Sequence, residues 1–180
     1  MSVLFFLVAC TGGGKLGGGP NGVDTAPLPC DEREPTVTIG GSGVDDQARP
    51  IWTEMPEGSE QTMVHGPQGG WHILASADVQ STNQIVTIEY TIDWPAHQNA
   101  RVSSGAFRVM LVPDDRCGGF YAGMLGILDV SAVKDGELDT PPEVLAGEAL
   151  TLRMFVTDLD GLTAEDERGV VAALDPVDAQ

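Results

Sequence analysis

Hydrophobic and polar residues alternate in short runs from residue 35 to near the end of the chain. In the clearest run, residues 85–93, every second position is apolar: Val86, Ile88, Tyr90 and Ile92. This period of two predicts a β-strand with one face buried and the other in solvent. Further runs of strand length occupy residues 36–39, 61–66, 71–79, 107–112, 123–130, 150–156 and 170–174. Turn-forming residues separate the runs, so the pattern predicts about seven to nine short strands.

The pattern contains no amphipathic segment long enough for a stable helix. Residues 163–168, TAEDER, resemble the N-terminus of a helix, but the segment is too short for us to expect one. We therefore expect an all-β fold, an antiparallel β-sandwich of immunoglobulin-like type formed by residues 35–180. The Cys–Trp–Cys spacing of true immunoglobulin domains is not present, so the expectation concerns the architecture alone.

The N-terminal segment has the pattern of an export signal. Residues 3–9 are apolar, too short to span a bilayer, and end at Cys10 after a small residue. The tetrapeptide Leu-Val-Ala-Cys at residues 7–10 resembles the lipobox of bacterial lipoproteins, in which a signal peptide is cleaved before a cysteine that then carries a lipid. We expect residues 1–9 to be that signal peptide and Cys10 to be the lipid attachment site. A basic n-region is missing, which indicates a start codon further upstream; the alternative is an N-terminal strand with an ordinary cysteine.

Residues 10–34 are dense in glycine and proline and contain almost no large apolar side chain. Such a composition cannot bury enough surface to offset the entropy of ordering, so it predicts a disordered tether. As a flexible coil the tether would reach roughly 25–30 Å. That length suits a domain held just outside a membrane.

Two cysteines remain if Cys10 carries a lipid. Cys30 lies at the end of the predicted tether and Cys117 lies within the predicted domain. An exported protein can keep such a pair oxidised, which favours a Cys30–Cys117 disulfide. Two free thiols remain the alternative, because a sequence does not place their Cα atoms within bridging distance.

The charge is strongly acidic, with 27 Asp and Glu residues against 9 Lys and Arg residues and a formal net charge of −18. Such a surface repels phosphate backbones, so nucleic acid is excluded as a partner. Only Lys15 and Lys134 are lysines. The simplest interpretation of the charge is solubility, in keeping with a salty medium.

Residues 66–72, GPQGGWH, look most like a functional motif. Pro67 excludes the two-residue hairpin turns that need a positive φ at that position, so a type I turn with Gly69 in the left-handed region is expected, followed by Gly70. The resulting register pairs Gly66 with Gly70, His65 with Trp71, and Val64 with His72.

In that register His65 and His72 fall on opposite faces. No convergent metal site results, because a metal needs its imidazole ligands on one side. The strand that follows also lacks the helix N-terminus of a phosphate-binding loop.

Residues 156–167 hold a second candidate. Asp158 and Asp160 sit at the third and fifth positions of a calcium loop counted from Val156, but valine has no side-chain oxygen for the first ligand position. We therefore expect a hairpin turn at Asp160–Gly161, with a weak calcium site at Asp158 and Asp160 as the alternative. No nucleophile elbow or paired catalytic carboxylates stand out, so we expect no enzymatic activity and no cofactor.

Residues 39–79 and 150–171 together resemble a group of uncharacterised bacterial outer-envelope lipoproteins. The likeness lies in a Gly-x-Gln-Gly-Gly-aromatic-His phrase and in an Asp-x-Asp-Gly hairpin, and it is weak between about residues 95 and 140. It implies a β-sandwich exported to the cell envelope, on the outer rather than the inner membrane. The expected function is non-enzymatic: a lipid-anchored sandwich that binds a protein, glycan or surface partner. A small-ligand or calcium-binding accessory module is the alternative.

Overall fold

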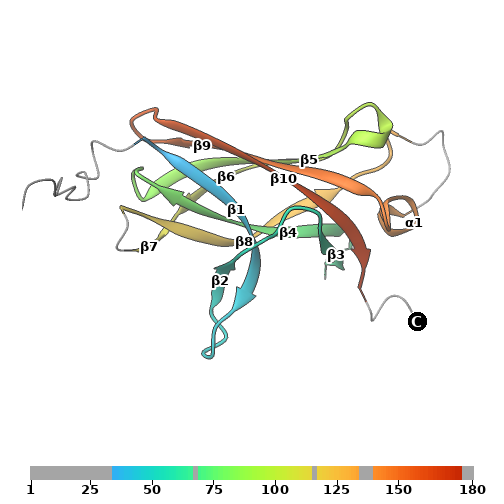
Figure 1. Cartoon of the computed structure of the whole chain (residues 1–180), viewed down its shortest axis with the longest axis horizontal. Helices are drawn as coiled ribbons and strands as arrows, with labels where there is room; N and C mark the ends of the chain where they lie inside the picture. Colours follow the sequence, from blue (N-terminus) through green and yellow to red (C-terminus); the bar gives the residue numbers. More distant parts are fainter. Residues whose placement is uncertain (1–33, 67–68, 115–116, 134–139, 176–180) are drawn as a thin grey trace, which may run out of the picture.

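The computed structural model describes residues 34–66, 69–114, 117–133 and 140–175. Within these residues the chain forms one ten-stranded sheet (Figure 1). The strands are β1 (Thr36–Val44), β2 (Pro50–Thr53), β3 (Ser59–His65), β4 (Trp71–Gln80), β5 (Ile85–Trp94), β6 (Ala100–Met110), β7 (Val112–Pro113), β8 (Gly118–Leu128), β9 (Ala149–Asp158) and β10 (Thr163–Leu174). A 3-10 turn (Pro95–His97) and a short helix α1 (Pro141–Leu145) complete the described elements. None of the helices in this part of the chain is long and apolar enough to cross a bilayer.

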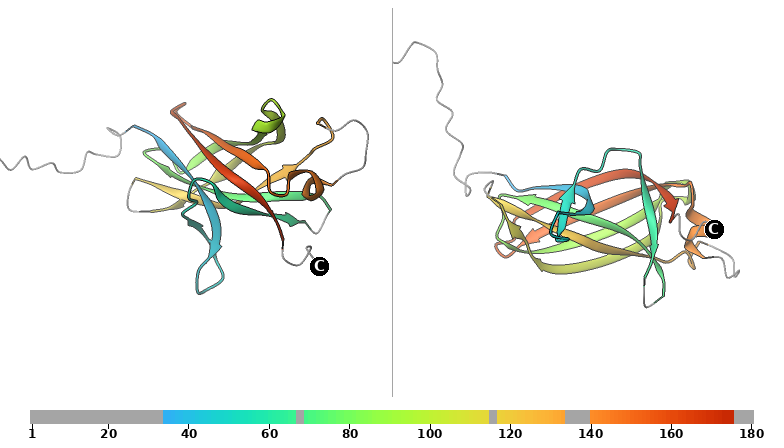
Figure 2. Two further views of the ribbon diagram at one scale, coloured as in Figure 1. Left: turned by 45° about the vertical axis from the view of Figure 1, so that its right-hand side comes forward. Right: turned by 90° about the horizontal axis from the view of Figure 1, so that it is seen from below.

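The sheet curls so that its two halves pack face to face (Figure 2). One layer has the order β10-β9-β5-β6, and the other is formed by β1, β4 and β8. Strand β3 joins the two layers, because it pairs antiparallel with β4 and parallel with β10. The predicted all-β sandwich is confirmed, with the β3–β10 pair as its parallel exception.

Alternating apolar residues of both layers fill the core. In β5 the four apolar positions Val86, Ile88, Tyr90 and Ile92 are at most 1% exposed, as their period-two spacing predicts. The opposite layer contributes Ile73, Ala75, Ala77 and Val79 of β4, all 0% exposed. Burial raises the pKa of Tyr90, whose hydroxyl has no hydrogen-bond partner among the described residues. One face of β4 and one face of β5 therefore belong to the core.

The helix-like opening at residues 163–168 is the start of β10. These residues pair antiparallel with β9 across the hairpin at Asp160 and Gly161. Exposed and half-buried residues alternate here, as is typical of a strand. Glu165 and Glu167 point to solvent, whereas Asp166 is half-buried and accepts a hydrogen bond from the Ile39 amide at 2.8 Å. That bond links β10 to β1, two strands that are not neighbours in the sheet.

Candidate functional site

The GPQGGWH segment forms the predicted hairpin between β3 and β4. Val64 pairs with His72 and His65 pairs with Trp71, the register expected from the sequence. Gly69 has φ +82° and Gly70 has φ +86°, and the Gly69 amide donates to the Gly66 carbonyl at 3.0 Å. Pro67 lies outside the described residues.

The two histidines of this hairpin have different neighbours. The ring of His65 lies 4.9 Å from that of Trp71, centroid to centroid. His72 lies against Gly66, where a Cβ atom would come within 2.6 Å of its ring. Burial, with a smaller contribution from the charge of His65, lowers the pKa of His72. The described residues hold no group of three or more potential metal-binding side chains.

Asp158 is a structural residue of the β9–β10 turn. One of its carboxylate oxygens accepts the amides of Asp160 and Leu162, each at 2.9 Å. The other oxygen accepts both the amide and the side-chain nitrogen of Asn83 at 3.2 Å. Burial opposes ionisation, but these donors outweigh it and hold the pKa of Asp158 below its ordinary value. Asp160 also accepts from Asn83, at 2.8 Å, so both carboxylates of the alternative calcium site are engaged by protein donors.

The cysteines are described only in part. Cys117 is disulfide-bonded, and it lies just before β8 with φ +72°. Its expected partner Cys30 and the expected lipid attachment site Cys10 lie outside the described residues, as do the predicted signal peptide and all of the tether but Glu34.

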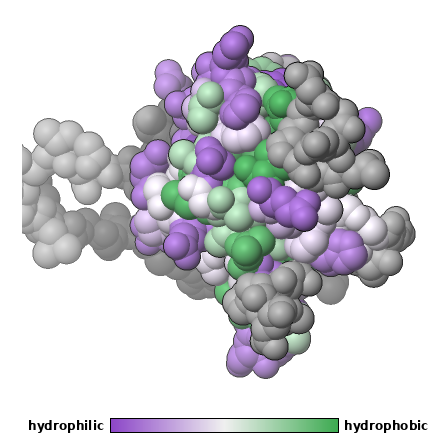
Figure 3. All heavy atoms as spheres, turned by 90° about the vertical axis from the view of Figure 1, so that its right-hand side faces the viewer, coloured by the Kyte–Doolittle hydropathy of each residue, from purple (hydrophilic) through white to green (hydrophobic). Residues whose placement is uncertain are grey.

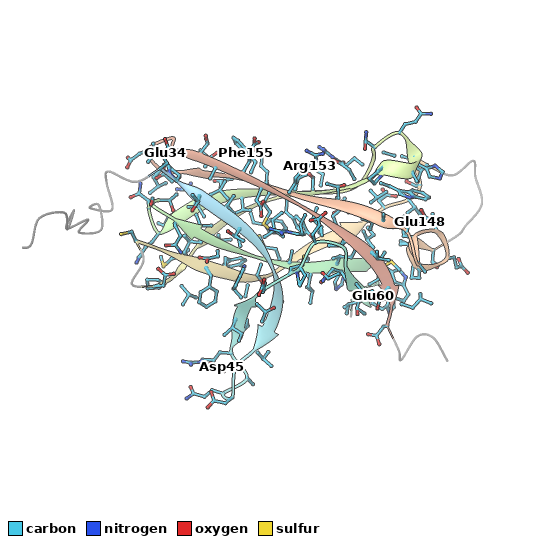
Figure 4. The ribbon with its side chains drawn as sticks, viewed as in Figure 1. Glu34, Asp45, Glu60, Glu148, Arg153 and Phe155 are labelled. Atoms are coloured by element: carbon cyan, nitrogen blue, oxygen red, sulfur yellow. The ribbon has the colours of Figure 1, made fainter. Side chains whose placement is uncertain are left out.

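An open groove of about 470 Å³ lies on the outer face of the β10-β9-β5-β6 layer. Alternate residues of these strands point away from the core and line it, as Arg153 and Phe155 do in Figure 4. Charged side chains and one aromatic ring dominate the lining: Glu89, Arg101, Arg153, Phe155, Glu165 and Glu167.

Three of the lining residues, Arg101, Arg153 and Glu167, belong to an ion-pair network centred on Asp93. Asp93, whose side chain is 8% exposed, accepts from Arg101 at 2.9 Å and lies 3.3 Å from the Arg153 guanidinium. Arg153 also pairs with Glu167 at 2.7 Å. The hydrogen bond to Asp93 raises the pKa of Arg101. In this network the positive and negative side chains neutralise each other.

In the neighbouring part of the groove, the carboxylates are not paired with basic side chains of the described residues. Phe155 is 40% exposed, and it is directly paired with Glu89 on one side and with Glu165 on the other. Both carboxylates are exposed, and neither has an ion-pair or hydrogen-bond partner within the described parts of the chain. We call these three residues the Phe155 row.

Sequence reasoning missed the Phe155 row, although one signal was present. In β9 the inward positions are Leu150, Leu152, Met154 and Val156. Phe155 has the opposite parity, that of Thr151, Arg153 and Thr157, so an aromatic residue stands on a polar face. The ring departs from the usual alternation of such strands, in which the outer face is polar, and this departure is the signal that the sequence carried.

A second exposed surface is apolar. Leu125 and Ile127 of β8 are 44% and 63% exposed, and Ile127 pairs with His72 of β4. Apolar side chains also reach the surface at the end of the molecule shown in Figure 3, between hydrophilic ones. Nothing in the described residues indicates what would cover these side chains.

Taken together, the fold and the groove define a β-sandwich module with one open, charged face. No protein-family model matches the chain, and no curated protein does. Among solved structures, the chain is similar to an immunoglobulin-like protein from Pseudomonas aeruginosa, with 18% sequence identity and a TM-score of 0.31 over 77% of this chain and 98% of that one. At this TM-score the likeness supports no argument about ligand or activity.

Proposed function

We propose that this chain is a non-enzymatic, lipid-anchored protein of the bacterial cell envelope, and that its sandwich binds a partner through the outer face of β10, β9, β5 and β6. The observation that carries the proposal is Phe155, an exposed ring in an open groove. Aromatic residues are enriched at protein-binding surfaces, where a polar rim surrounds them. The lipobox-like residues 7–10 and the glycine-rich residues that follow support the anchor and the tether.

Photo-crosslinking in intact bacteria tests the binding face. A photoreactive amino acid replaces Phe155 in one strain and Glu60 in another; Glu60 is exposed on β3, well away from Phe155 (Figure 4). We expect a discrete crosslinked product from position 155 and none from position 60. Equal products from the two positions, or none from either, would contradict the proposed binding face.

Fractionation tests the anchor separately. With the native start of translation, Cys10→Ser should move the protein from the membrane fraction to the soluble fraction or block its processing. Cys30→Ser is the control, because it replaces another cysteine by serine without touching the lipobox-like site. If both variants fractionate like the unaltered protein, the lipid anchor is wrong.

A further inference from the structure

We infer that the partner docks a basic side chain, an arginine or lysine of a protein segment, onto Phe155 between Glu89 and Glu165. This inference rests on the binding face proposed above and names the chemistry that the face selects. Three observations carry it: the geometry of the Phe155 row, the lack of partners for its carboxylates, and the shortage of cations in the chain itself.

The geometry of the row suits a cation. Neighbouring strands are about 4.8 Å apart, so Glu89 and Glu165 stand roughly 10 Å from each other with Phe155 between them. The face of an aromatic ring carries partial negative charge and attracts an ammonium or guanidinium group within about 6 Å of its centre. A cation above Phe155 would therefore meet the ring below it and a carboxylate on each side.

The carboxylates of the row are available, in contrast to those of the adjacent network. Asp93 and Glu167 are held by Arg101 and Arg153, and Asp166 accepts from Ile39 and lies 3.3 Å from Arg168. Arg153 lies two residues from Phe155 on the same face, but its guanidinium is directed to Asp93 and Glu167. Within the described residues, Glu89 and Glu165 thus make no ion pair and no hydrogen bond.

The chain has little positive charge to supply. It contains 9 basic residues against 27 acidic ones, which gives the field around it a negative sign. Such a field steers cationic partners toward the surface and repels anionic ones, and its effect falls as salt rises. Charge complementarity therefore favours a basic protein segment over a neutral glycan or an acidic surface.

NMR titration of the full chain in detergent tests the inference. The probe is a blocked peptide, Gly-Arg-Gly-Lys-Gly, and the control peptide carries glutamine at both basic positions. We expect saturable shifts of the amides at positions 89, 155 and 165 with the basic peptide, weakening as salt rises, and none with the control. Saturable shifts of the same amides with a neutral oligosaccharide, without a response to the basic peptide, would overturn the inference.

Matched variants separate a specific site from general attraction. Phe155→Leu removes the aromatic face and should weaken binding by about 2- to 5-fold, whereas Phe155→Tyr should retain it. Glu89→Gln combined with Glu165→Gln should weaken binding by roughly 2- to 30-fold. Glu60→Gln changes one charge away from the groove and should leave the affinity unchanged. Equal affinity for all of these variants would overturn the inference.

The two proposals can fail separately. If position 155 gives no crosslinked product, the binding face itself is refuted, whatever the result of the peptide titration. Persistent crosslinks at position 155, together with no response to the basic peptide, refute the basic side chain and leave the binding face in place.

Discussion

Neighbouring residues of β9 face opposite environments. Leu152, Met154 and Val156 point inward and are at most 1% exposed, whereas Arg153 and Phe155 point outward into the groove. The inward set packs between the two layers and must fit its neighbours closely, because core packing tolerates little change in volume. The outward set meets solvent and can vary without disturbing that packing. In this strand, the core and the lining of the groove are thus formed by alternate residues.

The largest expected change in stability comes from comparing substitutions at two adjacent positions of β9. Met154→Ala should lower the free energy of unfolding by about 2–5 kcal/mol, because it leaves a cavity in the core. Phe155→Ala should lower it by about 1 kcal/mol or less, because the ring is partly exposed and its loss leaves no closed cavity. Urea unfolding measures both variants. Equal losses would show that Phe155 belongs to the structural face.

Asp158 ends the inward face of β9 and gives the next largest effect. Asp158→Asn replaces one acceptor by an NH₂ group beside the Asn83 donors, so it should cost about 1–2 kcal/mol. Asp160→Asn is the control; among the described residues its side chain accepts only from Asn83, and the change should cost less than about 0.5 kcal/mol. A marked rise of the melting temperature with millimolar calcium would instead assign these carboxylates to a metal.

The pH dependence of stability provides a second measurement on Asp158. Its pKa is lower in the folded state than in the unfolded state, so its contribution is complete above the ordinary aspartate value and is lost as pH falls through the folded value. Acid unfolding followed from about pH 5 downward should therefore differ between the unaltered chain and Asp158→Asn. Identical slopes would exclude a linked contribution from this carboxyl.

The ion-pair network on the outward face should matter less. Asp93→Asn removes the carboxylate shared by Arg101 and Arg153, whose side chains are 54% and 51% exposed. Solvent screens pairs of this kind, so we expect a loss of about 1 kcal/mol that diminishes in high salt. Glu167→Gln is the control, because its own side chain is 62% exposed and its pair should be worth close to nothing. A larger loss for Glu167→Gln than for Asp93→Asn, in thermal melts at two salt concentrations, would reverse the ranking.

The sequence predicts the inward face well, and physical reasons explain why. Burial on one side of a strand leaves a local period of two, visible in residues 85–93 and 150–156. The β3–β4 register was also predictable, because Pro67 and two glycines restrict the turn that sets it. Residues 163–168 were assigned to no element from the sequence, because acidic residues are also typical of a helix start and the segment is too short for a helix; pairing with β9 makes it a strand.

The outward face was predictable only in part. The parity of β9 places Phe155 among polar residues, but its neighbours depend on which strands lie beside β9. Those strands are β5 and β10, and the pairing with β5 joins segments far apart in the sequence. The predicted hairpin at Asp160–Gly161 brings Glu165 beside Phe155, but no local pattern encodes the pairing with β5, so Glu89 could not be assigned to the same site.

The smallest expected effect concerns the charges of the Phe155 row themselves. Glu89→Gln combined with Glu165→Gln removes two like charges from a chain of net charge −18, so it should raise the free energy of unfolding by no more than about 0.5 kcal/mol at low salt. Since screening removes the same repulsion, the difference should vanish in high salt, with sodium and potassium equivalent. Glu60→Gln should show half of this effect or less, because it removes one charge at a distance from the groove. A loss of stability in the double variant would mean that these carboxylates support the fold. It would contradict the view that the outward residues of the sheet contribute little to stability.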